Sequence, residues 1–371
     1  MGKLLPVFSA VLLFCAASCK DGSEQASIAE PEGQEKILAA ELPPLDGGEV
    51  FYKGKDPFGG TMELQGEQLV ADTVIFKVQG AQALVKDSAL VLKTGQRILE
   101  FRLPDLKYVR DIGTFGQGPD EFMSPVLSAA REESLLGYVF ETLNSKLYSL
   151  DKEGKVHRYP FFEPQQGGGF RFSQKELAEA GSGDFVYADA SPSGKSIFRA
   201  VKQGDSLDVR EVYNLALNPK NKSWMAYVGD FVANTVKGRM AYAYKYFKIL
   251  KFMDVEGRTV KTLNFEREEY DETTAYRVDG MDANVTHYWG GCATDDYAYF
   301  LYSGRTPADV WKEGKAGINY IYVEQYDWNG NPVRRYKLDQ WGYFTVDGKN
   351  NKLYLLSTQH DDPFFVYDLP N

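Results

Sequence analysis

Short strand patterns that recur in groups of three constrain the fold of this chain more than any other feature of its sequence. From about Gly47 onward, runs rich in apolar and aromatic residues alternate with turns. Three of the groups carry the same turn between their last two strands: Asp151–Gly154, Asp254–Gly257 and Asp327–Gly330. Asp begins such a turn by accepting hydrogen bonds from the following backbone, and Gly ends it with a positive φ. This repetition predicts a modular all-β fold.

The groups predict six units of similar size. The strands are expected at 88–93, 97–103 and 107–112; 134–140, 145–150 and 155–160; 184–188, 195–201 and 208–214; 239–244, 247–253 and 258–265; 296–302, 318–326 and 332–338; and 352–357 and 364–369. Asp105, Asp151, Asp254, Asp327 and Asp368 occupy equivalent positions, 46, 103, 73 and 41 residues apart. If the interval of 103 holds two units, six units result, each of the size that propeller blades have.

Further strand candidates precede several groups, at 126–129, 286–290 and 343–347. They raise each unit to four strands, so we predict a six-bladed β-propeller with four antiparallel strands per blade. The last unit ends before its outermost strand. Gln68–Val78 belongs to no group, and pairing this N-terminal strand there would close the ring and leave no unpaired edge between the first and last blades.

A loop between the first two units is specified by its own residue types. Gly113, Gly116 and Gly118 permit positive φ, Pro119 fixes φ near −65°, and Phe122 can enter a core. This pattern predicts a rigid blade junction.

The N-terminus is typical of a targeting segment. Lys3 precedes the apolar run Leu4–Ala17, which at 14 residues is too short to cross a bilayer. The run ends in Ala16-Ala17-Ser18-Cys19, which resembles a lipobox, so residues 1–18 are interpreted as a lipoprotein signal peptide and Cys19 as the lipidated residue. An ordinary signal peptide with a chance cysteine is the alternative. An Asp directly after the lipidated cysteine would resemble a signal for retention in the inner membrane. Lys20 occupies that position instead, which favours the outer membrane. Residues 19–46 form an acidic flexible tether, and 47–371 the propeller.

The remaining cysteine and a helix signal complete the local predictions. Once the signal peptide leaves and Cys19 carries lipid, only Cys292 remains, so no intramolecular disulfide can form. A small buried thiol is expected there rather than a nucleophile.

Ser173–Glu176 matches a capping box and Gly181 a helix stop, which predicts one helix over 173–180.

The chain resembles the TolB-like six-bladed β-propeller lipoproteins of Gram-negative bacteria. The pattern Gly113-x-x-Gly-x-Gly-Pro-x-Glu-Phe-x-x-Pro125 is similar to that family's blade junction and to NHL repeats. Further resemblance to the TolB-like family lies in the segments 297–303, 326–333, 338–339, 346–347 and 353–354. These motifs specify blades rather than chemistry, and the resemblance implies no settled activity.

Charge and residue content exclude several classes of function. The formal net charge is −10, and an acidic chain without a basic block is unsuited to nucleic acid or to an anionic membrane surface. The three histidines have no zinc-ligand spacing, and no phosphate loop or Gly-x-Ser-x-Gly motif is present. We therefore expect no cofactor, no metal and no enzymatic activity.

Strand topology predicts where a ligand would bind. Alternating strands place the Asp-x-x-Gly turns on one face of the ring and the long connections on the other, and long loops on a rigid scaffold usually carry binding. The candidates on this face are Arg305, Trp311, Lys312, Glu269, Tyr270, His287, Trp289 and His360. The alternative interpretation is that these residues only cover the core.

These observations predict a monomeric lipoprotein of the cell envelope, attached by its lipid alone and anchored in the outer membrane, facing the periplasm or the cell surface. It would act as a non-catalytic module that binds a protein or glycan partner through the long-loop face. The alternative is a propeller hydrolase or lyase with a calcium-type metal in the central channel.

Overall fold

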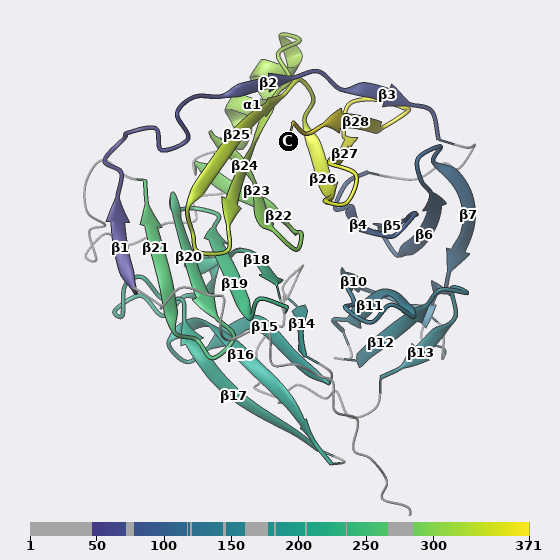
Figure 1. Ribbon diagram of the computed structural model, residues 1–371, viewed down its shortest axis with the longest axis horizontal. Coiled ribbons are helices and arrows are strands. Elements are labelled where there is room, and N and C mark those ends of the chain that lie inside the picture. The colour runs from purple at the N-terminus through teal and green to yellow at the C-terminus, as the bar shows by residue number, and fades with distance from the viewer. Residues whose placement is uncertain are drawn as a thin grey trace, which may run out of the picture.

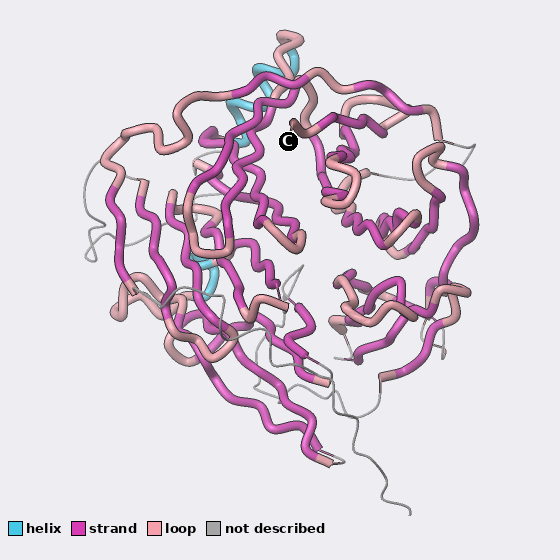
Figure 2. Tube along the Cα trace, in the orientation of Figure 1, coloured by secondary structure: helices cyan, strands magenta, loops and turns pink. Residues whose placement is uncertain are grey.

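The computed structural model describes residues 47–71, 78–116, 118, 121–143, 146–159, 177–181, 183–204, 206–234, 236–265 and 285–370. These residues form six β-sheets arranged around a central axis (Figures 1 and 2). Within these ranges the one α-helix is α1 (Pro307–Lys315), and one 3-10 helix covers Trp224–Tyr227. The prediction of an all-β, six-bladed propeller is confirmed.

Blades I to III each contain four antiparallel strands, named in order from the centre outward. Blade I consists of β4 (Gln82–Lys86), β5 (Ala89–Thr94), β6 (Arg97–Arg102) and β7 (Lys107–Ile112). Blade II consists of β10 (Pro125–Ser128), β11 (Leu135–Glu141), β12 (Lys146–Asp151) and β13 (Val156–Arg158). Blade III consists of β14 (Leu177–Gly181), β15 (Asp184–Ser191), β16 (Gly194–Gln203) and β17 (Ser206–Asn214).

Blades IV to VI each include a strand from the N-terminal part of the chain. Blade IV consists of β18 (Gly229–Asn234), β19 (Arg239–Tyr244), β20 (Ile249–Asp254), β21 (Thr259–Asn264) and β1 (Gly48–Phe51). Blade V consists of β22 (Thr286–Ala293), β23 (Tyr297–Arg305), β24 (Ile321–Asp327), β25 (Pro332–Leu338) and β2 (Met62–Leu64). Blade VI consists of β26 (Gly342–Asp347), β27 (Lys352–Ser357), β28 (Phe364–Asp368) and β3 (Glu67–Leu69).

Residues 47–69, which we call the N-terminal strap, run along the outer rim of blades IV, V and VI (Figure 1). β1 and β2 pair in parallel with β21 and β25, whereas β3 pairs antiparallel with β28. Ring closure by an N-terminal strand is therefore confirmed, over Glu67–Leu69. The rest of the predicted strand includes residues 72–77, which lie outside the described residues. The parallel strands β1 and β2 were not predicted.

Side chains attach the strap to the blades beneath it. The ring of Tyr52 stacks on Phe265 with centroids 4.9 Å apart, and Phe58 meets the edge of Tyr326 at 5.6 Å. Ion pairs join Arg335 to Asp56 at 3.0 Å and Lys337 to Glu63 at 2.7 Å. Because exposed ion pairs stabilise a fold by at most about 1 kcal/mol, the aromatic contacts and ladder hydrogen bonds dominate the attachment.

The hydrophobic core is divided into six clusters, one at each interface between neighbouring blades. The cluster between blades IV and V, for example, joins Leu250 and Phe252 to Tyr288, Phe300 and Tyr326, all fully buried. This arrangement explains why the strands read as nearly continuous apolar runs, because both faces of each blade pack against a neighbour.

The Asp-x-x-Gly turns also contact the preceding blade. Arg110 of β7 donates hydrogen bonds to the backbone carbonyls of Lys152 and Glu153 in the turn of blade II. Arg210 of β17 pairs with Glu256 in the turn of blade IV at 2.7 Å. In the same way, Lys261 of β21 donates to Asn331, next to the turn of blade V, at 2.7 Å. These turns therefore join blades as well as strands.

The predicted blade junction forms a small ordered element. β8 (Thr114–Phe115) pairs in parallel with β9 (Glu121–Phe122), and Phe122 is fully buried against Tyr148. Gly113 has a φ of 66°. The backbone N–H of Gly118 donates to Glu121 Oε2 at 2.6 Å, and Pro119 lies outside the described residues. Phe122 anchors the connection between blades I and II.

The helix predicted over 173–180 is wrong in its described part. Leu177–Gly181 is the strand β14, which pairs with β15 through Leu177 and Tyr187. Leu177 and Glu179 are buried, so tertiary packing in the inner ring overrides the local helix signal. Residues 173–176 lie outside the described residues.

Candidate functional site

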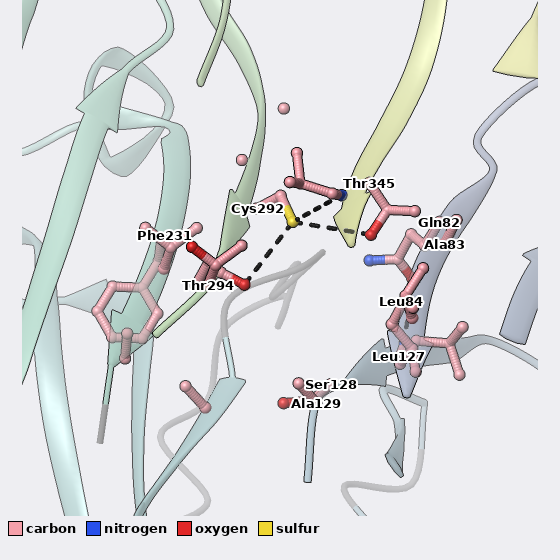
Figure 3. Close-up of a pocket in the computed structure, with 18 of the residues that line it drawn as sticks. Gln82, Ala83, Leu84, Leu127, Ser128, Ala129, Phe231, Cys292, Thr294 and Thr345 are labelled. Carbon is pink, nitrogen blue, oxygen red and sulfur yellow. Dashed lines mark hydrogen bonds between the residues drawn. The ribbon is translucent and has the colours of Figure 1, made fainter. Parts of the chain in front are cut away.

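The six innermost strands, β4, β10, β14, β18, β22 and β26, surround a central channel (Figure 1), and Figure 3 shows a close-up of the pocket within it. It contains a cavity of about 290 Å³. Small side chains at its wall, among them Ala83, Ala129, Ala178, Gly290 and Gly291, leave this space open. The lining continues into Arg131, Val236 and Asp295, which lie in connections between first and second strands, so the cavity reaches the face of the Asp-x-x-Gly turns.

Polar side chains in the channel connect neighbouring blades. Ser128 Oγ donates to the carbonyl of Leu177 at 2.7 Å, joining blades II and III. Asn234 Nδ2 donates to the carbonyl of Asp295 at 2.6 Å, joining blades IV and V. Gln82 Oε1 accepts from the N–H of Leu127 at 3.1 Å and joins blades I and II. These atoms satisfy backbone groups that would otherwise lose hydrogen bonds on burial.

Glu179 is the buried acid of the channel. It accepts a hydrogen bond from the N–H of Arg131 at 2.8 Å, and burial raises its pKa above the ordinary value. Tyr138 also donates to this carboxyl group. A raised pKa is a property of general acids, but it also follows from a structural bond between blades. Glu179 bonds blade III to blade II, so its raised pKa follows from a structural contact.

Cys292 lies beside Thr345 in the channel wall (Figure 3). Its Sγ accepts from the N–H of Val346 at 3.3 Å and lies 3.7 Å from Thr345 Oγ1. Burial raises the pKa of the thiol, which disfavours the nucleophilic thiolate. In the ranges that the structure covers, no three His, Cys, Asp or Glu side chains are grouped so as to hold a metal ion.

Of the residues predicted for binding, six are described and all lie on the face of the long connections, which we call the loop face. The other face, with the Asp-x-x-Gly turns, is the turn face. His287 and Trp289 begin β22, Arg305 ends β23, Trp311 and Lys312 belong to α1, and His360 lies between β27 and β28. Glu269 and Tyr270 lie outside the described residues.

Arg305 contacts its own blade and the next one through both terminal nitrogens, while its Nε has no hydrogen-bond partner among the described residues. Its guanidinium donates to Glu313 of α1 and, at 2.7 Å, to the carbonyl of Tyr320. It also lies over the ring of Tyr320 at 3.9 Å and near that of Trp341 at 5.5 Å. With a side-chain exposure of 12%, Arg305 holds α1 in place and is not available as an exposed cation.

Two tryptophans and a tyrosine continue this contact toward the channel. Trp289 stacks on Trp341 with centroids 5.2 Å apart and lies 5.1 Å from Tyr343. Tyr343 accepts through its hydroxyl from the N–H of Gly80, at the entry to blade I, at 2.8 Å. Trp289 Nε1 is buried without a hydrogen-bond partner among the described residues. Trp289 and Trp341 are only partly buried, so this stack forms part of the loop face.

The two predicted histidines differ in environment. His287 stacks on Tyr302, and burial together with Lys248 lowers its pKa to about 4, so it is neutral at neutral pH. His360 is exposed, with Nε2 2.9 Å from Gln340 Oε1. A neutral, stacked His287 suits packing at the channel mouth rather than charge recognition.

The long connection that carries Trp311 and Lys312 contains α1, whereas the sequence predicted only a loop there. Thr306 Oγ1 accepts from the N–H of Asp309 at 3.1 Å while Asp309 accepts from the N–H of Thr306, and Pro307 follows the cap. This Thr-Pro-x-Asp capping box was the available signal. α1 buries none of its residues, and Trp311 is 61% exposed.

Blade V encloses one further acid. Glu324 is fully buried, and its Oε2 accepts from the hydroxyls of Tyr288 at 3.0 Å and Tyr326 at 2.6 Å. Its Oε1 has no hydrogen-bond partner within the described ranges, and burial raises the pKa of the carboxyl group. The protonated, neutral form is favoured in such surroundings. Because Glu324 packs inside the blade and does not line the channel cavity, it belongs to the core.

None of the helices in the described residues is both long and apolar enough to span a bilayer.

Comparisons with known proteins support the fold. The family model described as TolB-like 6-blade propeller-like matches residues 200–349, which confirms the predicted resemblance to these propellers. No curated protein matches the chain by sequence.

Solved structures resemble the chain at low sequence identity. A member of the DUF4221 family from Bacteroides vulgatus is 11% identical, with a TM-score of 0.51, over 83% of this chain and 98% of its own. A protein described as a putative exported protein from Bacteroides fragilis is 9% identical, with a TM-score of 0.49, over 84% and 99%. At these identities the similarity concerns the fold alone.

Proposed function

We propose that this protein is a non-catalytic binding module of the cell envelope that presents its loop face to a protein or glycan partner. The observation that carries the proposal is α1: a capped helix, inserted into blade V, that buries none of its own residues and exposes Trp311. A helix that contributes nothing to the core is expected to serve an interaction. The fold and the TolB-like match support a binding or scaffold role in general terms.

The contacts in the channel support a role without catalysis. Ser128, Asn234 and Glu179 bond to neighbouring strands, and the thiol of Cys292 has a raised pKa. These contacts account for the channel's polar groups as bonds between blades. The apolar N-terminal run and the lipobox-like Ala16–Cys19 support an envelope location with Cys19 as the lipid anchor.

Capture experiments test the proposal. The domain without its signal peptide and Cys19, residues 20–371, would be immobilised and exposed to envelope extract and to a glycan array. For a partner so found, we expect Trp311→Ala to weaken binding by about 2 kcal/mol, which is roughly 30-fold, with an unchanged melting temperature. The matched control is Val236→Ala, which truncates an exposed apolar residue, 39% exposed, on the turn face. Binding that is lost in the control and kept in Trp311→Ala would contradict the proposal.

A further inference from the structure

The outward surface of α1 is basic although the chain as a whole is acidic, with a formal net charge of −10. Both acids of the helix are engaged locally: Asp309 completes the capping box, and Glu313 pairs with Arg305. Lys312 and Lys315 are exposed, and neither forms an ion pair with an acid in the part of the chain that the structure describes. Lys312 also interacts electrostatically with the exposed carboxylate of Asp309, one turn earlier. Both ammonium groups nevertheless face solvent.

Trp311 and Lys315 form one surface, and Lys312 lies on the adjoining side of the helix, about 100° further round. Lys315 Nζ lies 3.8 Å from the centroid of the Trp311 ring, one helical turn away. Lys312 follows Trp311 directly, and Ile318, 51% exposed, lies just beyond the end of the helix. The indole thus carries an ammonium group on one side and is open to solvent over most of its area. We call Trp311, Lys312, Lys315 and Ile318 the α1 patch.

The α1 patch is held rigidly. Arg305 ties the last turn of α1 to the carbonyl of Tyr320, and the capping box fixes the first turn. Gly314 faces Gln359, whose Nε2 donates to Asn319 Oδ1 at 2.7 Å. A surface that is ordered before binding loses little conformational entropy when it binds.

The size and charge of the α1 patch select among anionic partners. A nine-residue helix is about 13 Å long, and one tryptophan with one isoleucine covers far less than the roughly 800 Å² per partner of a standard protein interface. Two lysines on an acidic domain also give little attraction to an anionic bilayer, at about 1 kcal/mol for each lysine near the surface. A sugar that carries a carboxylate matches both features, because its ring can cover the indole while the carboxylate meets an ammonium group.

We propose that the α1 patch binds an acidic glycan, through a uronic acid whose ring stacks on Trp311 and whose carboxylate pairs with Lys312 or Lys315. The proposal rests on the proposed function and deepens it by naming the class of partner. Because the recognition is partly ionic, affinity falls as salt concentration rises.

The test uses residues 20–371 and oligosaccharides of galacturonate, alginate and hyaluronan as probes, with the methyl-esterified galacturonate oligomer as a matched neutral probe. We expect at least one acidic oligomer to bind at least about tenfold more tightly than its neutral form at low salt. The double variant Lys312→Glu/Lys315→Glu is expected to lose at least about tenfold in affinity, and Trp311→Ala about 30-fold.

The matched control is Lys220→Glu/Lys222→Glu, which makes the same charge change at exposed lysines of another loop-face connection and is expected to keep full affinity. Equal binding of the neutral probe, unchanged affinity in Lys312→Glu/Lys315→Glu, or binding of none of the acidic oligomers would overturn the acidic-glycan proposal. Stronger binding to polyglutamate or to vesicles containing phosphatidylglycerol would overturn it as well. The loop-face proposal fails separately, if a captured partner is indifferent to Trp311→Ala.

Discussion

Gly257 of blade IV lies directly against Val212 of blade III: a Cβ at Gly257 would stand 1.9 Å from the carbonyl oxygen of Val212. Gly257 also has a φ of 82°, in the left-handed region. The glycine of this Asp-x-x-Gly turn is therefore required twice, once by the turn and once by the neighbouring blade. The repeated motif that defines the fold in the sequence also sets how closely two blades approach.

Gly257→Ala is expected to lower the free energy of unfolding by about 3 kcal/mol, because it adds backbone strain and a clash with a main-chain atom. The control is Gly238→Ala in the same blade, where φ is 59° and no atom of the described residues lies within 4 Å of the added Cβ. It is expected to cost only about 1 kcal/mol. Urea denaturation of both variants checks the difference, and equal losses would show that the blade contact does not matter.

Glu324 is expected to make stability depend on pH. Its folded-state pKa is raised, so as pH rises the unfolded chain releases this proton first and becomes favoured. The resulting loss begins near the unfolded pKa of about 4.3 and ends at the higher folded pKa, with about 1.4 kcal/mol lost for each unit between them.

Glu324→Gln keeps an acceptor for Tyr288 and Tyr326 and removes the titration. The difference in unfolding free energy between Glu324→Gln and the unmodified protein is therefore expected to shift in favour of the variant over the pH range above about 4.3. Glu324→Ala leaves the buried hydroxyls of Tyr288 and Tyr326 without their acceptor and creates a cavity. It is therefore expected to lower the free energy of unfolding by about 3 kcal/mol. A constant difference across this pH range in the Gln variant would contradict a buried, protonated Glu324.

The strap is expected to be essential and the segment before it dispensable for stability. A chain that begins at Val70 loses β1, β2 and β3 and exposes the edges of blades IV to VI, together with Phe265 and Tyr326. We expect a large fall in melting temperature or no folding at all. Deletion of residues 20–46 is expected to change the melting temperature little. Thermal unfolding by circular dichroism compares the two, and equal melting temperatures would rule out closure by the strap.

Cys19 is expected to carry the membrane anchor. Intact mass of membrane-extracted protein is expected to exceed that of residues 19–371 by the mass of acyl groups. Cys19→Ala is expected to move the protein out of the membrane fraction, since the lipid supplies the attachment. Unchanged fractionation of this variant, or a soluble chain cleaved at another position, would disprove lipidation.

The sequence predicted most strands of the blades closely because their apolar runs and the Asp-x-x-Gly turns are local signals, but it missed β4, β14 and β18, the innermost strands of blades I, III and IV. It did not predict β1 and β2, which at four and three residues are too short to show a recognisable strand pattern. The capping box at Ser173 suggested a helix that packing against Tyr187 excludes over Leu177–Gly181. For the loop face, the sequence placed Arg305 correctly but could not show that Glu313 and the Tyr320 carbonyl already occupy its guanidinium, because that depends on contacts across a chain reversal.

The strands of the strap are made first but pair with strands that are made much later. Residues 47–69 are made before the blades, yet their partners β21, β25 and β28 lie about 200 to 300 residues further along the chain. At about 5–20 residues per second, β3 waits roughly 15–60 s for β28. Glu49 in β1 and Glu63 in β2 place a charge in each of these short strands, which lowers the risk of wrong pairing during this delay. Because β3 pairs with β28, the ring stays open until β28 has been made, and the unpaired strap must remain available over that whole interval.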